Sequence, residues 1–198
     1  MSRAAVKPRR GRFATRSLRS GIFRGSERMS AAIMKKLSRL EILLVRLQAQ
    51  AALLDWAFED IARRAGLVFE LGLGHGRTHD HLRKHLPNRD IYVFDREVDC
   101  YPDCQPDPQH LILGELSETL PEAAKRFARQ AALVHADLGS YYPARNQAAG
   151  ELVSRLLPPI LAAGCLVLSD LPLAMAGADR LPMPGHLPDE SYFIYRAR

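Results

Sequence analysis

Apolar residues recur at helical spacing in the first third of the chain. Steps of three and four alternate through Leu37, Leu40, Leu44, Leu47, Ala51, Leu54, Phe58 and Ile61. This heptad pattern predicts one long helix, which we place within residues 29–64. The simpler interpretation is that its apolar face packs only on the domain's own sheet. Because Leu53 and Trp56 widen the face beyond a single seam, we also expect it to pair with a second copy of the chain in a homo-oligomer.

Short apolar runs alternate with helical stretches over the rest of the chain. Strands are predicted at residues 67–71, 91–95, 111–114, 132–137, 165–169 and 191–196, and helices at residues 78–85, 120–130 and 145–157. Apolar strands separated by helices are typical of a parallel sheet that is covered on both faces. The predicted fold class is therefore α/β, with a Rossmann-like, doubly wound, mostly parallel sheet over residues 65–198.

The positive charge of the chain is concentrated at its beginning. Residues 1–28 hold nine Lys or Arg and one acid, Glu27, so they contribute +8 to a net charge of +6, and residues 29–198 carry −2. The leader is a basic arm for nucleic acid or acidic lipid, an organelle transit peptide, or an extension upstream of a start at Met29. All three interpretations predict that it is disordered. A domain with this charge balance does not favour nucleic acid as a partner.

Composition limits the class of protein further. A chain of 198 residues with 47 % hydrophobic content can form one domain with a sizeable core. Its three cysteines, Cys100, Cys104 and Cys165, are too few for a disulfide framework and indicate a reducing, cytoplasmic location. No apolar run is long enough for a membrane span.

Carboxylates follow the predicted strands at one edge of the sheet. They are Glu70, Asp95, Glu115, Asp137 and Asp170. Ligands of doubly wound sheets bind at the carboxyl ends of the strands, so we expect the functional site there.

Three glycines, Gly72, Gly74 and Gly76, separate the first predicted strand from the helix after it. Glycine lets the backbone turn tightly and lie against a ligand, and a helix N-terminus offers free N–H groups to an anionic group. A dinucleotide site requires G-x-G-x-x-G, whereas Arg77 occupies the position of its third glycine. The spacing therefore counts against NAD.

The stretch Glu70-x-Gly72-x-Gly74-x-Gly76 resembles motif I of the class I S-adenosylmethionine-dependent methyltransferases, and the compact layout is similar to a small bacterial family of S-adenosyl-L-methionine methyltransferases. The resemblance covers about residues 60–198. It implies that Asp95 holds the ribose hydroxyls, that Glu115 lies near the adenine amine and that Leu116 lies against the adenine ring. The cofactor-binding residues that it implies are Glu70, Gly72, Gly74, Gly76, Arg77, Thr78, Asp95, Arg96, Glu115, Leu116 and Asp137.

Two departures from the family pattern narrow the prediction. Only 28 residues follow Asp170, so we expect a shortened C-terminal end in which the helix before the last strands is short or missing. The sequence after the fourth strand is Asp137-Leu138-Gly139-Ser140, without the Asn-Pro-Pro-Tyr or Asp-Pro-Pro-Tyr that accompanies methylation of a flipped base.

These observations predict an enzyme that transfers a methyl group from S-adenosylmethionine to a small molecule. A non-catalytic module that binds S-adenosylmethionine or S-adenosylhomocysteine is the alternative, and an NAD-linked oxidoreductase is disfavoured by Arg77. No catalytic residue is assigned. His135, Asp137, Tyr141 and Tyr142 lie nearest the expected acceptor, where a general base is needed only if the acceptor must lose a proton. The simpler interpretation of His135 is a histidine inside a buried strand, and Tyr141 and Tyr142 fit pocket walls.

No metal site is expected from the sequence. Cys100, Cys104 and His110 provide only three local ligands, whereas a closed zinc site requires four. His81 and His85 have i, i+4 spacing but no H-E-x-x-H motif. An exposed helix that happens to carry several histidines is the simpler interpretation.

Overall fold

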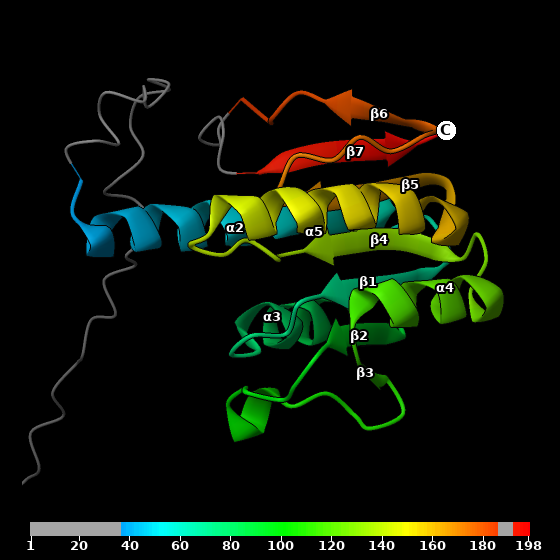
Figure 1. Cartoon of the computed structure of the whole chain (residues 1–198), viewed down its shortest axis with the longest axis horizontal. Helices are drawn as coiled ribbons and strands as arrows, with labels where there is room; N and C mark the ends of the chain where they lie inside the picture. Colours follow the sequence, from blue (N-terminus) through cyan, green and yellow to red (C-terminus); the bar gives the residue numbers. More distant parts are fainter. Residues whose placement is uncertain (1–36, 186–191) are drawn as a thin grey trace, which may run out of the picture.

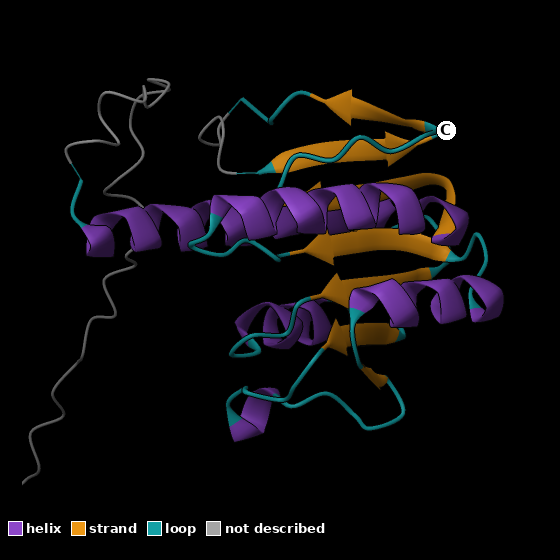
Figure 2. Cartoon of the chain, viewed as in Figure 1, coloured by secondary structure: helices purple, strands orange, loops and turns teal. Residues whose placement is uncertain are grey.

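The computed structural model describes residues 37–185 and 192–198, so the predicted leader lies outside the described residues. Seven strands form one sheet in the order β3-β2-β1-β4-β5-β7-β6 (Figures 1 and 2). They are β1 (Leu67–Leu71), β2 (Ile91–Asp95), β3 (Leu111–Leu113), β4 (Ala131–Ala136), β5 (Leu161–Ser169), β6 (Ala178–Leu181) and β7 (Phe193–Ala197). The first five are parallel, and β7 runs antiparallel to both β5 and β6. The predicted Rossmann-like, mostly parallel sheet is confirmed.

Helices cover both faces of this sheet. They are α2 (Arg39–Ile61), α3 (Arg77–His85), α4 (Leu116–Arg126) and α5 (Pro143–Leu156), with short 3-10 helices at Pro102–Cys104 and Pro158–Ile160. Successive strand residues point to opposite faces, so Val68 joins the core under α2 and α3, and Phe69 joins the core under α4 and α5. None of the helices in the described ranges is long and apolar enough to cross a membrane.

Helix α2 begins at a capping box, in which Ser38 and Glu41 satisfy each other's backbone N–H groups. Only the C-terminal half of α2 packs on the sheet, through Ala49, Gln50, Leu53, Leu54, Ala57 and Ile61. Figure 1 shows the N-terminal part extending past the strands. The predicted helix is present, but the predicted seam is wrong in part, because Ala51 is exposed. A straight helix repeats every 3.6 residues and not every 3.5, so its buried stripe rotates away from a heptad seam.

The C-terminal end is shortened as predicted, since residues 170–177 contain no helix between β5 and β6. The sequence did not indicate β6, a short edge strand with Asp179 and Arg180 at its centre and therefore no apolar run. Helix α4 also begins earlier than predicted, at Leu116, with Glu115 as its N-cap residue.

Candidate functional site

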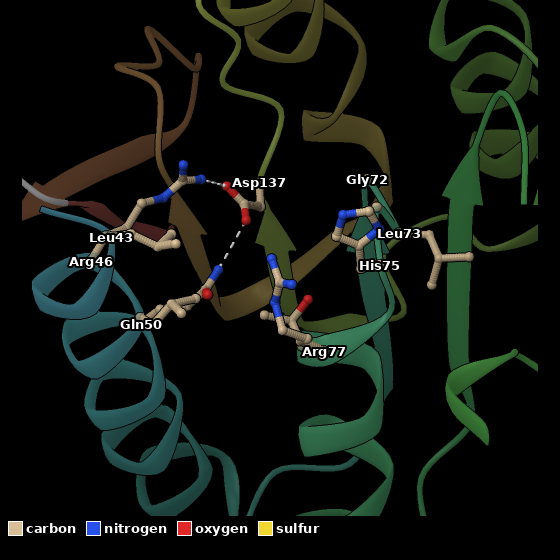
Figure 3. Close-up of a pocket in the computed structure, with 11 residues that line it drawn as sticks. Leu43, Arg46, Gln50, Gly72, Leu73, His75, Arg77 and Asp137 are labelled. Carbon is tan, nitrogen blue, oxygen red and sulfur yellow. Dashed lines mark hydrogen bonds and ion pairs between the residues drawn. The ribbon is translucent and has the colours of Figure 1, made fainter. Parts of the chain in front are cut away.

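The candidate site lies where the carboxyl ends of β1 and β4 meet the N-terminal half of α2 (Figure 3). A cavity of about 110 Å³ opens between them. It is lined by Leu43, Arg46, Leu47, Gln50, Gly72, Leu73, Gly74, His75, Arg77, Thr78 and Asp137. Helix α2 therefore forms one wall of this cavity, and the glycine loop forms the opposite wall.

The glycine loop is held by the carboxylate at the end of β2. Asp95 Oδ2 accepts hydrogen bonds from the backbone N–H groups of Leu73, at 2.7 Å, and Gly74, at 3.2 Å. Gly74 has φ +47°, and a Cβ added there would meet no atom within 4 Å. The loop therefore leaves open space beside Gly74, which a ligand can fill without displacing protein atoms.

At Gly72 and Gly76, unlike at Gly74, a side chain would collide with other parts of the protein. A Cβ at Gly72 would lie 2.6 Å from the carbonyl oxygen of Asp137, and a Cβ at Gly76 would lie 2.6 Å from the Cβ of Cys104. Both residues have positive φ, +91° and +79°. Close packing inside the protein thus accounts for two of the three glycines, and Gly74 alone faces open space.

A chain of buried polar groups runs beneath the cavity. Glu70, which is fully buried, accepts a hydrogen bond from the Thr78 hydroxyl, and its Oε2 lies 3.0 Å from His135 Nδ1. Gln50 donates from Nε2 to Asp137 Oδ2 at 3.0 Å and to the Tyr192 hydroxyl at 2.6 Å. Burial lowers the pKa of His135, but the Glu70 carboxylate outweighs it and the pKa is raised. The predicted burial of His135 is confirmed, and its partner is the motif I carboxylate.

Arg46 bridges two carboxylates that belong to neighbouring strands. Its Nη2 pairs with Asp137 and lies 3.5 Å from Asp170 Oδ2. Asp170 also accepts hydrogen bonds from the backbone N–H groups of Leu138, at 3.0 Å, and Gly139, at 2.8 Å. Burial and the neighbouring Asp137 raise the pKa of Asp170 to about 6. Burial also opposes ionisation of Asp137, but Arg46 and His135 outweigh it and lower its pKa.

A second, larger hollow of about 430 Å³ lies on the other side of Arg46. Its lining consists of Arg46, Gly139, Ser140, Tyr141, Asn146, Asp170 and Leu171. Tyr141 forms part of this wall, as predicted, whereas Tyr142 is exposed and lines neither of the two cavities. Arg46 is shared by both cavities and therefore separates them.

The predicted cofactor residues fall into three groups. Gly72, Gly74, Arg77, Thr78 and Asp137 line the smaller cavity, whereas Glu70, Gly76 and Asp95 support it from behind. The remaining three, Arg96, Glu115 and Leu116, follow β2 and β3 outside the lining of this cavity. Sequence reasoning missed Arg46 and Gln50. Their i, i+4 spacing, which puts two polar residues on one side of an apolar helix, was the available signal.

The strand order, the glycine loop after β1 and the carboxylates at the strand ends together define a Rossmann-like S-adenosylmethionine-dependent methyltransferase. The model of the S-adenosyl-L-methionine methyltransferase family matches residues 37–197, and the chain belongs to this family. S-adenosylmethionine is its cofactor.

The chain is also similar to solved structures. The S-adenosyl-L-methionine methyl transferase from Silicibacter pomeroyi DSS-3 is 42 % identical, with a TM-score of 0.78 over 82 % of this chain and 100 % of that chain. An RNA methyltransferase from Salinibacter ruber in complex with S-adenosyl-L-homocysteine is 19 % identical, with a TM-score of 0.44 over 74 % of this chain and 89 % of that chain. No curated protein matches the chain at a significant level.

Proposed function

We propose that this methyltransferase acts on a small molecule, which binds in the larger hollow and meets the cofactor beside Arg46. The observation that carries the proposal is the sharing of Arg46 by two adjoining cavities, one against the glycine loop and one against the β4–α5 loop. The charge of −2 over residues 29–198 supports a small acceptor over a nucleic acid.

The proposed cofactor-binding residues are the eleven that motif I and the strand ends indicate, with Glu70 acting from behind the cavity and not by direct contact. The open space beside Gly74 fits the methionine part of the cofactor, and Asp95 offers a carboxylate at the end of β2 for the ribose hydroxyls. S-adenosylmethionine supplies a methyl group that its sulfonium already activates, so the protein contributes mainly position and electrostatics. We propose that Arg46 and Gln50 fix the Asp137 carboxylate at the boundary between cofactor and acceptor.

Calorimetry with S-adenosylhomocysteine tests the cofactor contacts. Asp95→Ala is expected to weaken binding by about 2–4 kcal/mol, because charge-assisted hydrogen bonds contribute about 1.5–3 kcal/mol each and do not add fully. Asp95→Asn is expected to cost less, since one acceptor oxygen remains. Unchanged affinity in Asp95→Ala would show that Asp95 only supports the loop.

NAD serves as the control ligand, because the proposed site should not bind it. Arg77→Gly restores the dinucleotide spacing, yet the rest of the pocket does not suit a pyrophosphate, so this variant should not acquire NAD binding. Measurable NAD binding by the unmodified protein would contradict the proposed site.

Turnover of a metabolite pool by wild type, lost in Arg46→Gln while S-adenosylhomocysteine still binds, would place the acceptor next to Arg46.

We also propose that the exposed leucines of α2, Leu40, Leu43 and Leu44, pair with a second copy of the chain. Their exposed fractions are 65 %, 45 % and 50 %, which is unusual for three neighbouring leucines on one helix.

A cytoplasmic location is proposed on the three free thiols of Cys100, Cys104 and Cys165. For residues 1–28, the proposal remains a basic leader that takes no part in the folded domain.

A further inference from the structure

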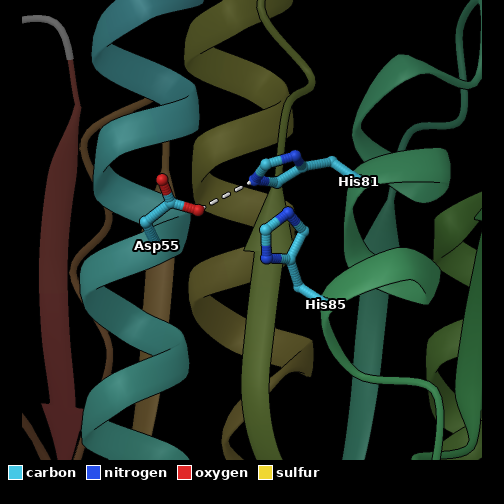
Figure 4. A group of neighbouring side chains, drawn as sticks. All are labelled: Asp55, His81 and His85. Carbon is cyan, nitrogen blue, oxygen red and sulfur yellow. Dashed lines mark hydrogen bonds and ion pairs between the residues drawn. The ribbon is translucent and has the colours of Figure 1, made fainter. Parts of the chain in front are cut away.

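Away from the cofactor site, α2 and α3 bring two histidines and an aspartate together (Figure 4). Asp55, His81 and His85 each offer a ligand atom, and these atoms all lie within 4.8 Å of one another. His81 Nε2 is 3.2 Å from Asp55 Oδ1. We propose that the three residues bind a divalent transition metal of the Zn²⁺ type, which would join α2 to α3.

The local sequence explains why the side chains converge. His81 and His85 are four residues apart on α3, so they lie on one face of that helix. Asp55 and Phe58 are three residues apart on α2, and the Phe58 ring stacks on His85, with centroids 5.3 Å apart and planes at 20°. The same ring lies 5.6 Å from that of His81. Phe58 therefore orients both imidazoles next to the Asp55 carboxylate.

The charged residues near this cluster do not occupy Asp55, His81 and His85, so the three side chains can bind a metal ion. The two cations between His81 and His85 in the sequence, Arg83 and Lys84, both pair with Asp80. Within the described ranges, the Asp55 carboxylate has His81 as its ion-pair partner, and the ring nitrogens of His85 form no hydrogen bond. A ligand set without competing partners is ready to bind a cation.

The donor set selects the type of metal. Imidazole nitrogen suits Zn²⁺, Cu²⁺, Ni²⁺ and Fe²⁺, whereas Mg²⁺ and Ca²⁺ require oxygen ligands. Zn²⁺ holds nitrogen and carboxylate ligands at about 2.0–2.2 Å, so small rotations of these surface side chains would close the set. Three protein ligands leave the fourth tetrahedral position to water. Because α2 also carries Arg46 and Gln50, and α3 begins at the glycine loop, the metal would brace the two walls of the cofactor cavity.

The test is a Zn²⁺ titration of the full, tag-free chain by calorimetry and thermal shift. Wild type should bind one equivalent, with a rise in Tm of about 5–10 °C at a hundred-fold excess over Kd. His85→Ala, His81→Ala and Asp55→Asn should each weaken binding at least about ten-fold and remove the thermal shift. All three positions are at the surface or partly exposed, and circular dichroism verifies that the variants fold.

Two control variants exclude other ligands. His110→Ala removes a partly exposed histidine that lies next to Asp90 and the Tyr92 ring, and Cys100→Ser removes the accessible thiol. Both should bind Zn²⁺ like wild type, and Co²⁺ in wild type should give a tetrahedral visible spectrum without a thiolate charge-transfer band. Any one of three results would overturn the proposal: no saturable Zn²⁺ binding by wild type, undiminished binding by His85→Ala, or loss of binding in Cys100→Ser.

Discussion

Glu70 and His135 form an ion pair across β1 and β4 in which the carboxylate Oε2 lies 3.0 Å from the imidazole Nδ1, and neither residue is exposed. The register of the sheet places them directly opposite each other on adjacent parallel strands. The charge of Glu70, the motif I carboxylate, is therefore balanced by His135 inside the protein. It cannot serve a ligand as a free, solvated charge.

His135→Ala should be strongly destabilising, because it leaves the Glu70 carboxylate buried and without its partner. Breaking a buried ion pair from one side typically costs about 3–5 kcal/mol. Urea unfolding would measure the effect. His110→Ala removes a partly exposed histidine next to Asp90 and the Tyr92 ring, and should cost no more than about 1 kcal/mol. A small cost for His135→Ala would mean that water reaches Glu70.

The carboxylate pair Asp137 and Asp170 should make stability depend on pH. The pKa of Asp170 is raised from 3.8 to about 6 in the folded chain, so the folded state holds this proton longer than the unfolded state does. The stability contribution is complete below pH 3.8 and is lost as the pH rises through about 6. The slope is limited to about 1.4 kcal/mol per pH unit for one group.

Asp170→Asn tests this directly, because asparagine does not titrate. The variant should gain stability relative to wild type as the pH rises from 4 to 7, measured by urea unfolding at both ends. Asp90→Asn, which changes an exposed acid, should keep the wild-type slope. A difference between wild type and Asp170→Asn that is constant with pH would show that Asp170 titrates at its ordinary pKa.

The same substitution should have different effects at Gly74 and Gly76. Gly74→Ala meets open space, so only its φ of +47° costs stability, about 1–2 kcal/mol, while the new methyl group occupies the proposed cofactor space. Gly76→Ala collides with Cys104 and should cost more, since overpacking adds about 1–3 kcal/mol. Thermal unfolding and calorimetry with S-adenosylhomocysteine separate the two effects. Equal affinity in Gly74→Ala and wild type would remove Gly74 from the cofactor site.

Periodicity was sufficient to predict the parallel part of the sheet, because each buried strand is a mainly apolar run, such as Leu67–Leu71 with Glu70 as its one polar residue. It could not predict β6, whose polar residues form an edge strand only because β7 offers hydrogen bonds to it. The same limit applies to the site. Glycines and strand-end carboxylates are visible as local patterns, whereas the contacts of Arg46 with Asp137 and Asp170 join residues far apart in the chain.

The exposed end of α2 yields the last prediction. Leu40 and Leu44 are exposed in the N-terminal half of α2, and neither lines the cofactor cavity. Leu40→Glu combined with Leu44→Glu should therefore leave the domain folded and able to bind S-adenosylhomocysteine. If these leucines hold two copies together, light scattering should report a smaller species, because each buried leucine contributes about 1.5–3 kcal/mol and a buried carboxylate opposes association.

Leu113→Glu is the matched control, since Leu113 is 53 % exposed at the end of β3, the strand at the opposite edge of the sheet from β6. It should leave the size of the assembly unchanged. A folded Leu40→Glu, Leu44→Glu variant with the wild-type mass would exclude this helix end as the interface. A smaller species from Leu113→Glu instead would move the interface to the β3 edge, where an unpaired strand can add a second copy by backbone hydrogen bonds.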